Sequence, residues 1–315
     1  MIDMDVLLQK TSRTFALAIP LLPEPTRHQV SLAYLLFRIA DTFEDATQWP
    51  ASRQIETLRR FIVLLDREPA EAQGLAAECA GDPPLSHAGY QELLAQMPLV
   101  LEELAKCSPA ASATIRRHVT RSAEGMIGFV QRMDGQRNLV LGSVPDLRDY
   151  CYAVAGVVGE MLTELYLLDR PTLQLFAGQL RERAAEFGEG LQLVNILKDA
   201  HGDAAEGRVY LPRAVPVREI LDLAERDLER AAEFVELMQR GGAQRGLVAF
   251  NAFISGLATA NLRILAERGL GAKLSRTDVA RISAGVLEDL DGADDSDASD
   301  ETDEAITSPA VSVLV

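Results

Sequence analysis

Two short acidic segments in this 315-residue chain repeat one spacing. Asp41 and Asp45 lie four residues apart, and so do Asp199 and Asp203. Residues four apart share one face of a helix, where two like charges destabilise the helix unless a cation lies between them. Carboxylate oxygens suit Mg²⁺, which usually completes its coordination with water and substrate phosphates. The two pairs together therefore indicate a site that presents several Mg²⁺ ions to a diphosphate.

The second pair continues a polar stripe along its helix. Gln192 and Asn195 precede Asp199 at helical spacing, and the residues between them are apolar. Taken alone, the two amides are equally well explained as hydrogen-bonded core residues, and the first aspartate pair as a solvated helix end. Three nearby basic residues could hold phosphate oxygens: Arg38, Lys198 and Arg208. Because an allylic cation survives only in a dry cavity, the apolar helices around the pairs complete a pattern that predicts Mg²⁺-dependent isoprenoid chemistry.

The composition favours helices to position these residues. Ala, Leu, Glu and Arg dominate, and no sustained strand-like alternation or repeat is present. Apolar residues at helical spacing predict a helix over 27–46. Further helices are predicted near 52–66, 90–105, 109–133, 147–168, 173–201, 217–239, 244–267 and 277–287, and a long loop over 68–86. Without a Gly/Ser linker, residues 1–287 are predicted to form one all-α bundle with a central apolar cavity.

The net charge of −16 is concentrated near the end of the chain. Residues 288–304 hold ten acids and no base, so the rest of the chain carries −6. This stretch has too little apolar content to offset its ordering entropy, and we predict a disordered acidic tail over 288–315. Neither the tail nor the body offers the basic stripe that binds nucleic acid, so we expect no nucleic-acid partner.

Cysteine usage and hydropathy bear on location. The three cysteines are far apart and lack metal-ligand spacing, which favours a reduced, cytoplasmic setting. The first ten residues carry acids where a secretory signal peptide carries bases. The longest charge-free apolar run, 247–262, is short for a membrane span. We therefore expect a cytoplasmic protein with no transmembrane segment and at most peripheral contact with a membrane.

Five motifs, in the expected order, resemble the squalene/phytoene synthase family over most of residues 8–286. Each motif alone is weak, and their order makes the resemblance specific. In this chain they are Ser12-Arg13-Thr14-Phe15; Tyr34 with Arg38-x-x-Asp41-x-x-x-Asp45; the YCYAVAGVVG of residues 150–159; Gln192-x-x-Asn195-x-x-x-Asp199-x-x-x-Asp203; and Gly207-Arg208-x-Tyr210-x-Pro212. The resemblance implies the isoprenoid synthase fold.

The resemblance also implies roles for individual residues. The metal ligands would be Asp41, Asp45, Asn195, Asp199 and Asp203, with Mn²⁺ able to replace Mg²⁺. The substrate contacts would be Ser12, Arg13, Phe15, Arg38, Val154, Gly159, Gln192, Asn195, Lys198 and Arg208. Tyr34 and Tyr150 would steady cations or relay protons, and Lys273 and Arg276 would meet a phosphate of NADPH. Gly159 is equally well explained by tight helix packing.

The family chemistry joins two prenyl diphosphates head to head. With farnesyl diphosphate the intermediate is presqualene diphosphate, which yields squalene with hydride from NADPH, dehydrosqualene by proton loss, or hydroxysqualene with water. Residues 250–262 and 271–276 resemble the squalene branch, although Lys198 replaces a common Arg and a late-helix proline is missing. The alternatives are a phytoene synthase acting on geranylgeranyl diphosphate, a terpene cyclase, and a non-catalytic assembly factor. The apolar product is the reason to expect peripheral membrane contact.

Overall fold

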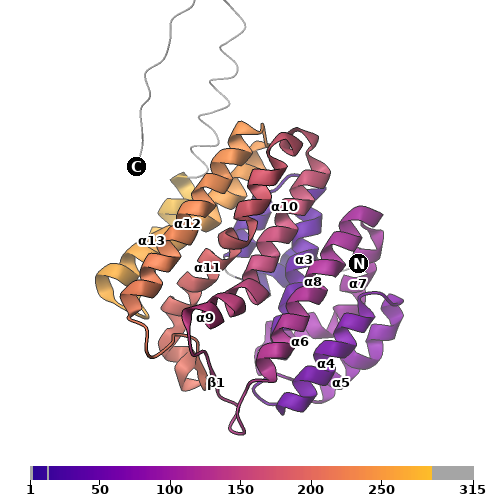
Figure 1. Ribbon diagram of the computed structural model, residues 1–315. Helices are drawn as coiled ribbons and strands as arrows, with labels where there is room; N and C mark the ends of the chain where they lie inside the picture. The colour runs from indigo at the N-terminus through magenta and orange to yellow at the C-terminus, as the bar shows by residue number, and fades with distance from the viewer. Residues whose placement is uncertain (1–2, 13, 286–315) are drawn as a thin grey trace, which may run out of the picture.

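In the computed structural model, which describes residues 3–12 and 14–285, nearly all regular structure is helical (Figure 1). Arg13 and the predicted tail over 288–315 lie outside the described residues. The elements are α1 (Met4–Thr11), α2 (Phe15–Ala18), η1 (Ile19–Leu21), α3 (Thr26–Glu44), α4 (Ala51–Leu64), η2 (Pro69–Glu71), α5 (Ala72–Gly81), α6 (Ala88–Ala95), α7 (Met97–Lys106), α8 (Pro109–Val130), β1 (Leu139–Val140), α9 (Val144–Cys151), η3 (Tyr152–Gly156), α10 (Val157–Asp169), η4 (Pro171–Phe176), α11 (Ala177–Ala205), β2 (Arg208–Val209), α12 (Val217–Arg240) and α13 (Arg245–Arg268). Residues 276–285 are also helical.

Helix α3, which carries the first aspartate pair, is buried on almost every side. Leu32, Ala33 and Leu35 point in different directions around it, and each is fully buried. A helix that is apolar all round needs partners on all sides. It packs against α4, α6, α7, α8 and α10, and Figure 1 shows α3 and α8 between the group α4–α7 and the helices α10–α13. The polar end of α3 therefore lies among neighbouring helices, with the side chains of Asp41 and Asp45 partly exposed.

Glycines allow α11, which carries the second aspartate pair, to lie against α10 and η3. A Cβ atom at Gly159 would lie 1.9 Å from the carbonyl oxygen of Ala184, and one at Gly188 would lie 2.0 Å from that of Ala155. No side chain fits at either position. The η3 segment between α9 and α10 is a turn of π-helix, a feature often found at functional sites. This contact fixes how far the second pair lies from residues 150–159.

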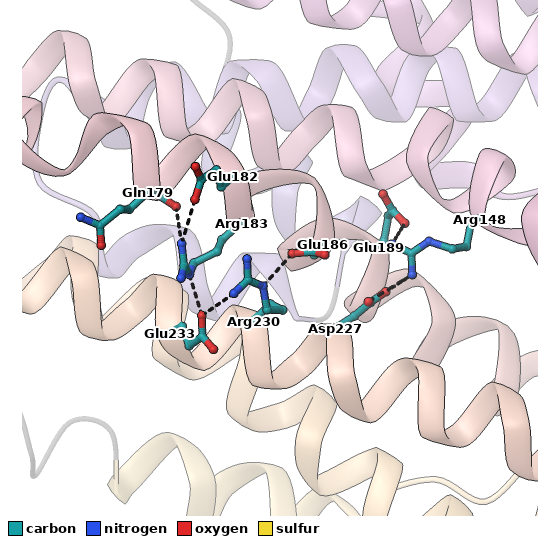
Figure 2. A network of polar contacts seen from close by, with 9 residues as sticks. All are labelled: Arg148, Gln179, Glu182, Arg183, Glu186, Glu189, Asp227, Arg230 and Glu233. Carbon is teal, nitrogen blue, oxygen red and sulfur yellow. Dashed lines mark hydrogen bonds and ion pairs between the residues drawn. The ribbon is translucent and has the colours of Figure 1, made fainter.

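A row of ion pairs joins α11 to α12 (Figure 2). Arg183 of α11 reaches Glu233 of α12 at 2.7 Å. Further along, Arg148 of α9 pairs with Asp227 at 3.0 Å and with Glu189 at 2.8 Å. The guanidinium of Arg148 thus lies between carboxylates of α11 and α12, and α9 is tied to both helices.

The two strands are short and parallel. Leu139 of β1 pairs with Arg208 of β2, and Val140 pairs with Val209. Strands of two residues are too short to show the alternation that identifies strands in a sequence. Their pairing places the connection between α8 and α9 beside the connection that follows α11.

The predicted all-α class is confirmed, and the structure differs from three of the predicted segments. The expected loop over 68–86 contains α5, whose buried residues Ala72, Leu75, Ala76 and Cys79 recur at helical spacing among alanines, which favour helix. The helix predicted over 90–105 is two helices, α6 and α7, with Pro98 in the first turn of α7. The helix predicted over 147–168 is interrupted by η3.

Two helical stretches of the described chain are long and apolar enough to cross a membrane. They are Val144–Asp169 and Arg245–Arg268. In their most apolar windows, 61% and 56% of the residues are buried inside the protein. Core helices of soluble proteins share these properties, so the two stretches are weak indications of a membrane span.

Candidate active site

The two predicted acidic pairs line one polar pocket. Asp41 and Asp45 come from the end of α3, and Asp199 and Asp203 from the end of α11. The rest of the polar stripe faces the same pocket, as do several residues expected to contact substrate. These further lining residues are Arg38, Tyr150, Val154, Gln192, Asn195 and Arg208. The helical spacing therefore orients each pair as predicted, and the packing of α3 and α11 brings the pairs together.

Basic side chains partly neutralise three of these aspartates. Arg38 lies 3.4 Å from Asp41, one turn away on α3. Arg208 donates a hydrogen bond to Asp45, and Lys273 donates one of 2.7 Å to Asp199. Each of these basic groups can also donate hydrogen bonds to phosphate oxygens. Arg38 and Arg208 thus place cationic groups inside the polar pocket itself.

Two carboxyl groups of the pocket hold protons more tightly than usual. Burial raises the pKa of Asp41 to about 6, although Arg38 opposes the shift. Burial, and then the charge of Asp199, raise the pKa of Asp203 to about 6. Both groups are therefore destabilised as bare anions in this place. A bound cation would remove that penalty.

Glu44 is a pocket residue that the sequence reasoning missed. Its side chain is buried, and Oε1 has no hydrogen-bond partner among the described residues. Burial, followed by the charge of Asp45, raises the pKa of the Glu44 carboxyl well above its usual value. Its position three residues after Asp41 places it on the same helical face, which was the available signal.

Tyr150 forms a pair with Tyr210. The two hydroxyl groups are 2.9 Å apart and the rings are stacked with centroids at 4.5 Å. Both tyrosines line the polar pocket. Burial, and then the charge of Glu44, raise the pKa of each hydroxyl. Both therefore stay neutral and able to donate. Tyr210 was visible in the sequence only as part of a motif.

An apolar pocket adjoins the polar one. The two share five residues: Arg38, Asp41, Val154, Gln192 and Asn195. Its other lining residues are mostly apolar and include Phe15, Tyr34, Val158, Gly159, Leu162, Phe187, Phe250 and Ile254. Tyr34 lines this pocket, and its hydroxyl donates to the carbonyl oxygen of Thr11 at 2.8 Å. The central apolar cavity stays a prediction.

The remaining predicted site residues lie elsewhere. Ser12 accepts a hydrogen bond of 2.9 Å from the backbone N–H of Phe15, so its hydroxyl caps α2. Lys198 and Arg276 line a third pocket, which shares Phe15, Leu191, Asn195 and Ile254 with the apolar one. Lys273 donates a hydrogen bond to Asp199 and is not among the residues that line this third pocket.

The polar pocket fits divalent metal ions by its donor chemistry. Its carboxylate and amide oxygens are hard ligands, and the unpartnered oxygen of Glu44 faces no competing donor among the described residues. Within residues 3–12 and 14–285, no three His, Cys, Asp or Glu side chains converge on one point. Mg²⁺ commonly uses one or two carboxylates and takes its remaining ligands from water and phosphate. The residues are therefore suited to ions shared with a bound diphosphate.

Comparisons with known proteins agree with this chemistry. The family model for squalene/phytoene synthase matches residues 8–244. The chain is 31% identical over 213 residues to the squalene synthase of Eremothecium gossypii, a match that covers 66% of this chain and 45% of that protein. It is 28% identical over 232 residues to the Botryococcus squalene synthase of Botryococcus braunii, a match that covers 72% of this chain and 46% of that protein. The matched region thus spans less than half of each relative.

A solved structure shares the fold. The structure of TcSQS in complex with the ligand E5700 superposes with a TM-score of 0.73 and 23% sequence identity. The superposition covers 92% of this chain and 88% of that one. At this level of identity the likeness concerns the fold alone.

Proposed function

Since this chain belongs to the squalene/phytoene synthase family of prenyltransferases, we propose that it joins two farnesyl diphosphates head to head. The main support for this proposal is that an acidic pocket and an apolar pocket adjoin and share lining residues. A prenyl diphosphate has the same division between a charged head and an apolar chain. Its head fits beside the four aspartates, and its chain fits among Phe187, Phe250 and their apolar neighbours.

In the first half-reaction, one farnesyl diphosphate loses pyrophosphate and leaves an allylic cation. The C2=C3 double bond of the second molecule attacks this cation, and loss of a proton closes the cyclopropane ring of presqualene diphosphate. Asp41, Asp45, Asn195, Asp199 and Asp203 would hold the metal ions, which supply Lewis-acid neutralisation of the leaving group. Arg38 and Arg208 would bind the same oxygens. Released pyrophosphate is the base best placed to accept the proton.

In the second half-reaction, presqualene diphosphate ionises and its carbon skeleton rearranges. The neutral Tyr150–Tyr210 pair borders the pocket in which this cation would form, and the hydroxyl oxygens can stabilise it without being protonated. Where NADPH is bound, it supplies the hydride that gives squalene. Lys198 and Arg276, which line the third pocket, are suited to the phosphates of NADPH. The lining residues that this pocket shares with the apolar one, Phe15 among them, place the two pockets side by side. We place the reaction in the cytoplasm, with peripheral membrane contact for product release.

The test is product analysis with purified protein. Farnesyl diphosphate and Mg²⁺ should yield squalene only when NADPH is present, and presqualene diphosphate otherwise. Excess chelator should abolish turnover, and Mg²⁺ or Mn²⁺ should restore it. Dehydrosqualene or hydroxysqualene regardless of NADPH would exclude squalene as the product. Formation of phytoene from geranylgeranyl diphosphate, with no product from farnesyl diphosphate, would assign the chain to the C20 branch. The absence of product from either substrate would favour a non-catalytic family member.

A further inference from the structure

Arg137 lies in a backbone conformation that is unusual for a residue with a side chain. Its φ angle is +67°, in the left-handed region, and no other described residue except glycine has a positive φ. Left-handed non-glycine residues persist only where the surrounding structure holds them, and they cluster at functional sites. The contacts of Arg137 must therefore hold its backbone in this conformation.

The turn around Arg137 is closed by several hydrogen bonds. Its N–H donates to the carbonyl oxygen of Asp134 at 2.8 Å, and the Asp134 carboxylate accepts from the N–H groups of Gln136 and Asn138 at 2.8 and 2.9 Å. The side chain of Arg137 therefore projects from a preorganised turn. The next residues along the chain form β1.

The guanidinium of Arg137 binds the chain where α3 ends. It donates to the carbonyl oxygens of Ala46 and Thr47, each at 2.9 Å, and to that of Trp49. Carbonyl groups beyond a helix end have no partner within the helix, and a cation there also complements the helix dipole. Arg137 thus caps the segment that directly follows Asp45.

Gln54 extends this cap to the last turn of α3. Its amide oxygen accepts from Arg137 at 3.2 Å, and its amide nitrogen donates to the carbonyl oxygens of Phe43 and Glu44. Gln54 is fully buried, so these bonds are shielded from water. The backbone on both sides of Glu44 and Asp45 is therefore fixed by one connected set of donors.

The same turn also places Arg208. Leu139 donates from its N–H to the carbonyl oxygen of Gly207 at 2.9 Å, and Leu139 pairs with Arg208 in the β1–β2 ladder. Gly207 has φ +82°, and a Cβ there would lie 2.5 Å from Oδ1 of Asn138. Arg208 in turn donates to Asp45. One turn thus holds the end of α3 by a side chain and the partner of Asp45 by the backbone.

We infer that Arg137 is a positioning residue that sets the first acidic pair against Arg208, and so tunes how tightly the pocket binds divalent metal with diphosphate. The metal part of this inference rests on the proposed function. Residues that orient ligands from behind commonly change metal affinity by about 10- to 100-fold when removed. An effect of this size is expected although Arg137 lines none of the three pockets described above.

The test uses Arg137→Gly in the full chain. Glycine adopts the left-handed backbone without cost and leaves a space of guanidinium shape. Trp49 is the single tryptophan of the chain, it is buried, and its carbonyl oxygen binds Arg137, so its fluorescence reports on the cap. Binding of Mn²⁺ in the presence of inorganic pyrophosphate, followed by the electron paramagnetic resonance of free Mn²⁺, reports on the pocket. Arg132→Gly is the matched control, because Arg132 lies on the same connection and pairs with Asp146.

We expect Arg137→Gly to shift the Trp49 emission and to weaken Mn²⁺ binding at least about 10-fold. Millimolar guanidinium should restore both, whereas sodium at equal ionic strength should not, and Arg132→Gly should resemble wild type. If Arg137→Gly does not fold, Arg137→Lys keeps the charge but not the fork and should show the same weaker binding. Wild-type Mn²⁺ affinity in a folded variant would overturn the inference and leave the proposed function intact. Failure of the wild type itself to bind Mn²⁺ with pyrophosphate would overturn the proposed function and the inference with it.

Discussion

Lys273 donates a 2.7 Å hydrogen bond from Nζ to Oδ1 of Asp199. The lysine expected to meet a cofactor phosphate therefore occupies a carboxylate expected to bind metal. Lys198 is also close to Asp199, at 3.5 Å, so two lysines share this carboxylate. Lys273 and a metal ion would therefore compete for the Asp199 carboxylate.

The first prediction follows from this competition. Lys273→Met should tighten binding of Mn²⁺ with inorganic pyrophosphate, because the metal no longer has to displace an ammonium group. The pair is partly exposed and worth about 1 kcal/mol or less, so the gain should be about five-fold at most. Electron paramagnetic resonance of free Mn²⁺ measures it. Arg281→Met removes the same charge from the following helix, where Arg281 pairs with Asp278, and serves as control. Equal affinity in Lys273→Met and wild type would show that the two cations do not compete.

The second prediction concerns Asp41. Asp41→Asn should lower turnover of farnesyl diphosphate by orders of magnitude, because the amide cannot supply the charge that a metal needs. The melting temperature should stay the same or rise, since a carboxylate whose pKa is raised by burial is removed. Asp222→Asn on α12, which breaks an exposed pair with Arg218, should keep full activity. Near-normal turnover in Asp41→Asn would show that Asp41 is not a metal ligand.

The third prediction is a pH dependence of stability at Glu189, one of the carboxylates in Figure 2. Burial raises its pKa to about 7; Arg148 opposes the shift, whereas Asp227, Glu186 and Asp149 add to it. Between its usual value and about 7 the folded protein holds this proton more tightly than the unfolded chain, so stability falls as pH rises through that range. Wild type should therefore lose stability relative to Glu189→Gln as the pH rises from about 4.5 to about 7.

Thermal melts of both proteins across this range provide the measurement. Arg183, with help from Arg230, lowers the pKa of Glu233, so that carboxyl titrates below the range. Glu233→Gln on the same network should accordingly show no trend relative to wild type. A wild type that gains stability over Glu189→Gln as pH rises would mean that the pair with Arg148 outweighs burial.

The fourth prediction tests the contact between α11 and η3. Gly188→Ala should lower both the melting temperature and turnover, because the new methyl group would lie 2.0 Å from a backbone oxygen and must push the segments apart. Gly128→Ala in α8 is the matched control, since nothing lies within 4 Å of that position. It should stabilise the protein by about 0.5–1 kcal/mol through helix propensity. Equal melting temperatures for the two variants would refute the tight contact.

Much of the site could be predicted because helical periodicity is local. Asp199 and Asp203 share a face by spacing alone, as do Asp41 and Asp45, and the structure shows each pair on one pocket. That the two pairs meet depends on how α3 and α11 pack, which helical spacing does not encode. The shared spacing and chemistry of the pairs indicated a common site, and the family resemblance supported it. Glu44 was within reach of the same periodicity argument.

Other features depend on contacts that sequence spacing does not encode. Lys273 was assigned to a cofactor from the segment it belongs to, but its partner is set by where that segment folds back. Arg137 had no recognisable motif, because its role comes from a left-handed turn and from carbonyl groups about ninety residues earlier. The helix α5 was missed for another reason: nearby glycine and proline outweighed a buried pattern made largely of alanines.

The ion pair between Arg208 and Asp45 joins residues 163 positions apart in the chain. Contacts of such long sequence separation form late in folding, because the loop entropy is lost before the contact contributes. The acidic pocket should therefore be completed in the last stages of folding rather than serve as an early template. In a refolding experiment, helical signal should return before Mn²⁺ binding does, and a stalled intermediate would hold no metal.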